Sequence, residues 1–85
     1  MAEEKLIGKV THYFSKIGVA VIRLSDALQV GSIIHIKNSD RDFNQQVSSL
    51  QIEHEQVEKA IAGQSVGFKV DQKVHEGDDV YLVNE

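Results

Sequence analysis

The sequence predicts an all-β fold, a small closed antiparallel β-barrel of about six strands. Three glycines, Gly31, Gly63 and Gly77, each stand just ahead of a segment in which apolar residues alternate with polar ones. Glycine gives a turn its positive φ or its backbone freedom, and the β-branched and aromatic residues that follow are typical of half-buried strands. Closure into a barrel is expected because it hides edges that a thin core cannot otherwise protect.

The first two strands are predicted at Leu6 to Phe14 and Ile17 to Leu24, on either side of the short break Ser15-Lys16. Both are rich in β-branched and apolar residues, which favour strands. The second contains Val19-Ala20-Val21-Ile22 and has little polar relief until Arg23. Such a run predicts a strand that is covered on both faces for part of its length.

A turn at Ser25-Asp26-Ala27 leads toward the third predicted strand, Ser32 to Lys37. The polar segment Asn38 to Asp42 is the clearest loop, because it is rich in turn-forming residues. The next strand is expected over Phe43 to Ile52, where the phase of the alternation changes midway. That change predicts a β-bulge or a sharp bend near Val47 to Leu50.

One segment, Glu53 to Ala62, is a helical candidate. Val57 and Ile61 would share a helix face there, and Gly63 stands where a C-cap would. At most a turn or two is expected, and an irregular connection is the open alternative. The last two strands are predicted at Gln64 to Asp71 and Asp78 to Val83.

The length of 85 residues predicts one domain, with a disordered N-terminal segment at 1–5 and a β-barrel domain at 6–85. A chain of this size buries only roughly 60–65% of the surface that its unfolded form exposes. It contains no cysteine, so neither a disulfide nor a thiolate metal site is expected. The chain suits a reducing compartment and is expected to be cytoplasmic, with no membrane contact.

Charge is unevenly distributed along the chain. Residues 1–41 contain six Lys or Arg and four Asp or Glu, a charge of +2. Residues 42–85 contain three Lys or Arg and nine Asp or Glu, a charge of −6, so the net charge of the chain is −4. An acidic total predicts no avid DNA binding, and any RNA contact would be local. The candidate RNA- or partner-binding residues are Lys9, Tyr13, Lys16, Arg23, Lys37 and Arg41, with Phe14 as a further stacking residue; the alternative is that these are ordinary solvated positions.

No constellation for catalysis, metal or cofactor binding is found, so the chain is predicted to be no enzyme and to hold no cofactor. The histidines are scattered without metal-site spacing. The carboxylates in Glu53-His54-Glu55 and Glu76-Gly77-Asp78-Asp79 are predicted to be solvated turn charges, with Asp78 capping its turn. The four histidines are His12, His35, His54 and His75.

From about Ile17 to Val83, the chain resembles the β-barrel second domain of translational GTPases such as elongation factor Tu. Four elements appear in the order and spacing of that family. They are Gly18-Val19-Ala20-Val21, Leu28-Gln29-Val30-Gly31-Ser32-Ile33, Ala60-Ile61-Ala62-Gly63-Gln64-Ser65-Val66-Gly67 and Val74-His75-Glu76-Gly77-Asp78.

Over nearly its whole length, the chain is more similar to the small barrel appended to bacterial collagenase-like peptidases. Members of that family act in the hydroxylation of tRNA or ribosomal RNA. The likeness is carried by Ile7 to Phe14, Phe43 to Ile52 and Gly77 to Tyr81. The chain has no counterpart of the GTPase or peptidase-like portion, so the resemblance implies the barrel alone.

The resemblances imply a non-enzymatic binding module that contacts tRNA or ribosomal RNA, or a protein of translation or RNA modification. In elongation factor Tu the barrel holds the aminoacylated end of tRNA with an acidic residue and an arginine. Those positions fall on His54 and Val57, so Glu53 and His54 form a candidate pocket segment without the arginine. The alternative is an adaptor that docks on a separate catalytic or GTPase subunit, with a monomer as the default state.

Overall fold

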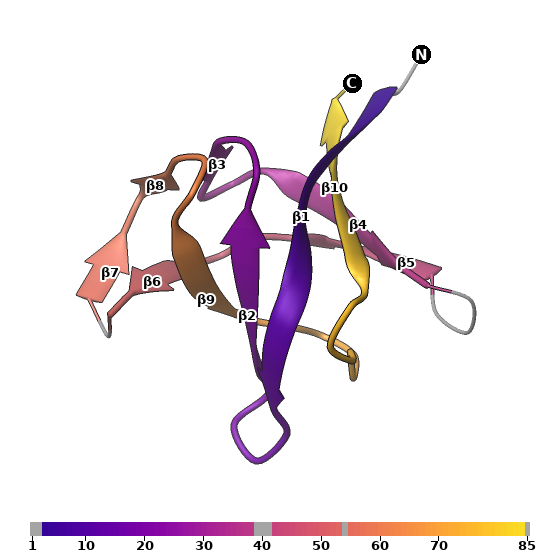
Figure 1. The fold of residues 1–85 in the computed structure, drawn as a ribbon, viewed down its shortest axis with the longest axis vertical. Coiled ribbons are helices and arrows are strands. Elements are labelled where there is room, and N and C mark those ends of the chain that lie inside the picture. Colours follow the sequence, from indigo (N-terminus) through magenta and orange to yellow (C-terminus); the bar gives the residue numbers. More distant parts are fainter. Residues whose placement is uncertain (1–2, 39–41, 54, 85) are drawn as a thin grey trace.

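The computed structural model describes residues 3–38, 42–53 and 55–84, which form strands joined by turns. All ladders between these residues are antiparallel. The all-β fold class is therefore confirmed (Figure 1). The described strands are β1 Glu3–Phe14, β2 Val19–Leu24, β3 Leu28–Gln29, β4 Ile33–Lys37, β5 Asp42–Gln46, β6 Leu50–Ile52, β7 Glu55–Val57, β8 Lys59–Ala60, β9 Ser65–Lys69 and β10 Asp79–Asn84.

The main sheet has the strand order β5-β4-β10-β1-β2-β9-β6-β7, and β3 pairs with β8 in a small second sheet. Figure 1 shows the start of β1 and the end of β10 close together, with the β1–β2 turn at the opposite end of the molecule. Strand residues alternate between the core and the outer surface, as in β2, where Ala20, Ile22 and Leu24 are buried. The same alternation places Val19 and Val21 on the outer face.

The described residues of this candidate segment, 53 and 55–62, form no helix, so the helical prediction is wrong. Glu53 forms a turn with a φ of 50°, and the following residues form β7 and β8. Val57 pairs with Leu50, and Ala60 pairs with Leu28. A short helix gains little stability by itself, and here pairing of β7 with the adjacent β6 and of β8 with the distant β3 outweighs the weak helical pattern.

The predicted bulge or sharp bend near Val47 to Leu50 is a break in the strand, because β5 ends at Gln46 and β6 begins at Leu50. Both Val47 and Leu50 are buried, and the intervening residues leave the ladder. Val47 N donates to Ser32 O at 2.8 Å, and Gly31 N donates to Val47 O at 2.8 Å. These bonds satisfy the backbone where the strand ends.

The longest strand, β1, contains the two register shifts of its ladders. One lies between Leu6 and Gly8 opposite β10, and the other lies between Val10 and His12 opposite β2. An extra residue bends a strand and increases its twist. The shifts therefore let β1 curve around the core while it pairs with a strand on each side.

The predicted disordered segment at 1–5 is wrong for residues 3–5, which lie in β1. Glu3 pairs with Asn84, and Lys5 forms an ion pair with Asp26. The Lys5 ammonium lowers the pKa of the Asp26 carboxyl, and so does the Ala27 N–H, which donates to it. Met1 and Ala2 lie outside the described residues.

A side chain connects β5 to the end of β9, although no ladder joins these strands among the described residues. Gln45 is only 6% exposed. Its Nε2 donates to Lys69 O at 2.9 Å, and its Oε1 accepts from Asp71 N at 2.9 Å. This amide bridge supplies two hydrogen bonds at a seam where a closed barrel would have a ladder.

Candidate interaction surface

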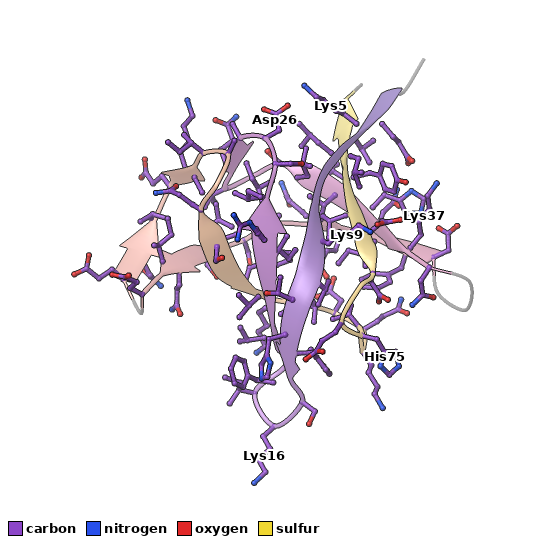
Figure 2. All side chains as sticks on the ribbon, viewed as in Figure 1. Lys5, Lys9, Lys16, Asp26, Lys37 and His75 are labelled. Atoms are coloured by element: carbon purple, nitrogen blue, oxygen red, sulfur yellow. The ribbon has the colours of Figure 1, made fainter. Side chains whose placement is uncertain are left out.

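The predicted basic set is not gathered into one groove. Lys9 and Arg23 are cross-strand partners on β1 and β2, and Lys9 forms an ion pair with Asp79 at 3.6 Å. Lys16 lies in the β1–β2 turn, far from Lys37 on β4 (Figure 2). Arg41 and His54 lie outside the described residues.

The two aromatic candidates of β1 point to opposite sides of the sheet. Tyr13 pairs with buried Ala20 and packs against the core. Phe14 pairs with Val19, is 46% exposed, and stacks on His12 with 4.4 Å between ring centroids. Of these two candidates, Phe14 is therefore the one on the outer surface.

The predicted turn glycines shape three turns of the chain. Gly31, Gly63 and Gly77 have φ values of 95°, 89° and 92°, a region that favours glycine. In the last of these turns, Asp78 is 2% exposed and its Oδ2 accepts from His75 N at 3.0 Å. The predicted capping role of Asp78 is thus confirmed.

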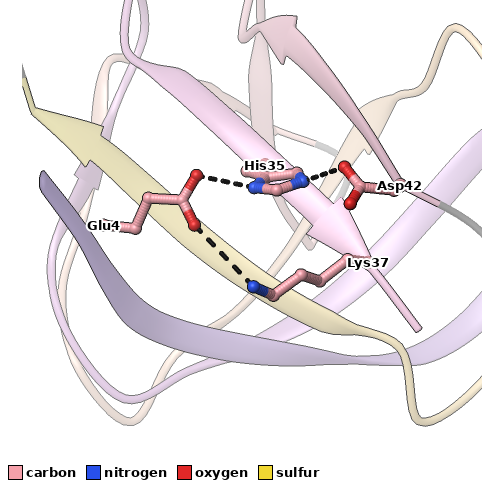
Figure 3. A network of polar contacts seen from close by, with 4 residues as sticks. All are labelled: Glu4, His35, Lys37 and Asp42. Atoms are coloured by element: carbon pink, nitrogen blue, oxygen red, sulfur yellow. Dashed lines mark hydrogen bonds and ion pairs between the residues drawn. The ribbon is translucent and has the colours of Figure 1, made fainter. Parts of the chain in front are cut away.

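A polar network crosses the outer face of β1, β10, β4 and β5 (Figure 3). His35 on β4 contacts Glu4 Oε2 through Nδ1 at 2.6 Å and Asp42 through Nε2. Lys37 Nζ lies 3.9 Å from Glu4 Oε1 and 4.6 Å from the centroid of the Tyr81 ring. The network links strands that are far apart in the sequence.

Both ring nitrogens of His35 face carboxylates, so the geometry is that of an imidazolium donating two hydrogen bonds. Partial burial lowers the pKa of His35, but the hydrogen bonds to Asp42 and Glu4 and the charges of both carboxylates outweigh it. The pKa is raised above 6.5. With neither nitrogen facing solvent as a base, the network suits a structural role.

We expect the stability that His35 contributes to depend on pH. Because its folded-state pKa is raised, the contribution is complete below the unfolded-state pKa of about 6.5 and is lost as pH rises through the folded-state value. Urea unfolding of wild type and His35→Gln between pH 6 and pH 9 measures this. The advantage of the wild type should shrink with rising pH, and a constant or growing advantage would contradict the assignment.

The outer face of β2 and β9 carries an apolar hollow with a volume of about 490 Å³. Val19 and Val21 form its centre opposite β9, where Gly67 pairs with Val21 and presents no side chain. Phe14 and Ile17, 46% and 62% exposed, close it at the hairpin end. Glu53 of the candidate pocket segment also lines it.

Three basic residues lie next to residues that line this hollow. Arg23 continues the outward row of Val19 and Val21 along β2, and Lys69 pairs with Val19 from β9. Lys16 neighbours Ile17 in the turn. Among the described residues, none of these three cations takes part in an ion pair.

Sequence reasoning placed Arg23 and Lys16 among the candidates but missed Lys69 and the apolar centre. The available signal was the uninterrupted run from Val19 to Ile22, which predicts a cover on both faces. The structure buries one side of that run and leaves Val19 and Val21 only partly covered. Lys69 joins the surface through the β2–β9 register, which no local pattern specifies.

No protein-family model matches the chain. An uncharacterised protease of Methanocaldococcus jannaschii is 40% identical over 80 residues, which is 93% of this chain. The chain spans 20% of the length of that protease.

Two crystal structures of the C-terminal domain of a protein described as a U32 peptidase of Geobacillus thermoleovorans share the fold. The first has a TM-score of 0.89 at 19% identity and covers 94% of this chain and 93% of that one. This chain therefore has the fold of that C-terminal domain. The second, a selenomethionine variant, has a TM-score of 0.85 at 19% identity and covers 89% of this chain and 96% of that one.

These findings correct the predicted function. The matches are to a protease and to a peptidase C-terminal domain, so the prediction of a translation-factor-like module that binds RNA is wrong. The resemblance to a peptidase-appended barrel agrees with the matches, whereas the likeness to elongation factor Tu has no support among them. A small barrel serves unrelated proteins, so its turn signals do not specify function.

The described residues include no helix of the length and hydrophobicity that a membrane span requires.

Proposed function

We propose that this chain acts as a non-catalytic β domain that associates with the catalytic portion of a U32-type peptidase. The observation that carries the proposal is the unequal match to the archaeal protease, which takes in 93% of this chain but only 20% of the relative. The fold shared with a peptidase C-terminal domain supports it. Catalysis would then reside in the larger remainder of such a protein.

The chemistry of the chain supports a non-catalytic role. His35, the histidine with the most polar contacts, has a carboxylate on each ring nitrogen. A general base needs one nitrogen within reach of a substrate proton or of a nucleophile. The carboxylates Glu4 and Asp42 are in turn engaged by His35, which leaves this cluster to join strands.

Affinity purification from the native host, with the tag at the chromosomal copy, tests the proposal. We expect a separate polypeptide with a U32-type peptidase sequence to be recovered in stoichiometric amount, bound to the tagged chain. Peptide mass spectrometry identifies it, and size-exclusion chromatography gives the ratio. Recovery of the 85-residue chain by itself, or with stoichiometric RNA, would overturn the proposal.

A further inference from the structure

The apolar hollow is an outer sheet face without a cover. Phe14 and Ile17 expose 46% and 62% of their surface, and Val19 and Val21 behind them are only partly buried. A sheet face that remains in water normally alternates with polar residues. Here the outward row of β2 is apolar until Arg23, which is the pattern of a face that another surface covers.

Gly67 contributes to the shape of this face because it carries no side chain. A Cβ built on Gly67 would lie 3.5 Å from Val19 Cγ1 and 3.9 Å from Ala20 O, which are ordinary contact distances. The backbone of β9 therefore does not require glycine for lack of space at this position. Its effect is to leave the hollow open beside Val21, so that a protruding side chain of a partner can enter.

The charges around the hollow identify the chemistry of the partner. Arg23, Lys69 and Lys16 lie near the apolar centre without ion-pair partners among the described residues, and one carboxylate, that of Glu53, lines the hollow. A second copy of the chain, docked through the same face about a two-fold axis, would set the net positive charge of one face against that of the other. An apolar surface edged with carboxylates would instead match both the centre and the rim.

From this we infer that the hollow formed by Phe14, Ile17, Val19, Val21 and Gly67 is the docking surface for the peptidase catalytic portion. The inference rests on the proposed function and adds which face of the chain contacts the peptidase catalytic portion. An apolar side chain of the partner occupies the hollow, and carboxylates at the edge of the partner surface pair with Arg23 and Lys69. The chain spans only 20% of its archaeal relative, so the remainder is large enough to supply such a surface.

Two pairs of matched variants test the surface in the native-host purification. Ile17→Asp adds one negative charge at an isoleucine that is 62% exposed beside the hollow, and Ile61→Asp adds the same charge at one that is 57% exposed elsewhere. Arg23→Glu reverses a charge at the rim, and Lys59→Glu reverses one on β8. All four positions are exposed, so thermal unfolding should find every variant folded.

We expect Ile17→Asp and Arg23→Glu to reduce the recovered peptidase polypeptide by about tenfold or more. Ile17→Asp would place an unpaired carboxylate against an apolar partner surface, and Arg23→Glu would set a like charge against the carboxylates of the partner. The variants Ile61→Asp and Lys59→Glu should stay within about twofold of wild type. Quantitative mass spectrometry gives the ratio of peptidase to chain.

Three outcomes count against the inference. Equal recovery with all four folded variants overturns the surface but leaves the proposed function standing. Absence of the peptidase from the wild-type sample removes the proposed function, and the inference with it. A homodimer in sedimentation equilibrium that Ile17→Asp dissociates would assign the face to a second copy and overturn the inference.

Discussion

Replacing Gly8 with alanine is expected to destabilise the fold more than any other exchange of one glycine for alanine. A Cβ at this position would lie 2.5 Å from Arg23 O and 2.8 Å from Ile22 Cγ2. Gly8 pairs with Leu24 in the β1–β2 ladder, and Ile22 is fully buried. Neither the backbone oxygen nor the packed side chain can move away without disturbing the ladder or the core.

The expected loss is about 3 kcal/mol, the upper part of the range for overpacked cores. In a domain of this size, that lowers the midpoint of thermal unfolding by more than about 10 °C. Circular dichroism melts of purified Gly8→Ala and wild type measure the shift. A midpoint within about 2 °C of wild type would show that β1 relaxes without cost.

Gly67→Ala is the matched control, because Gly67 is also a mid-strand glycine. The nearest atoms to its added Cβ are at 3.5 Å and 3.9 Å, so no clash forms. Alanine restricts the unfolded chain more than glycine does, and the change should be neutral or stabilising by up to about 1 kcal/mol. If Gly8→Ala lowers the stability and Gly67→Ala does not, the steric clash of the added Cβ is the cause of the loss at Gly8.

Replacing Gln45 with leucine is expected to cost about 2–4 kcal/mol, because it leaves Lys69 O and Asp71 N without their partner in a buried seam. Leucine is similar in size, so packing changes little and the loss reports the two hydrogen bonds. Urea unfolding gives the free energy of unfolding of each protein, and its dependence on urea concentration should have the same slope in both. A loss below about 0.5 kcal/mol would mean that water satisfies both groups when the amide is absent.

Two further variants define what the amide does. Gln46→Leu changes the exposed neighbour, whose Nε2 donates to Gly31 O at 3.3 Å, and should cost less than about 0.5 kcal/mol. Gln45→Glu keeps an acceptor for Asp71 N, but as a carboxylate it cannot donate to Lys69 O. Its deficit relative to wild type should therefore increase as pH rises above about 4.3, where the unfolded glutamate ionises.

The strands that the sequence predicts are those whose pattern is local. The alternation of Ile33 to Lys37 and of Val19 to Leu24 reflects one buried face, and both segments are strands. The segment from Glu53 to Ala62 was wrongly predicted because its strands are defined by partners outside the segment, β7 by the adjacent β6 and β8 by Leu28 of the distant β3. A pattern within one segment does not contain that information.

The candidate surface was predictable in part. The apolar run around Val21 by itself indicates a cover on a second face, and Arg23 marks where that run ends. The companions of Arg23 were not predictable, because Lys69 meets Val19 only through the β2–β9 register. Tyr13 and Phe14 were both taken as stacking residues of one surface, although adjacent strand residues face opposite sides.

The amide bridge at Gln45 also sets where the native protein fluctuates. On its other edge, β5 is held by a five-residue ladder to β4, whereas two hydrogen bonds from one side chain hold it to the end of β9. Local opening follows the least costly route, so the seam should part while the ladders stay intact. Such an excursion would admit water beside Phe43 and Val47 without global unfolding.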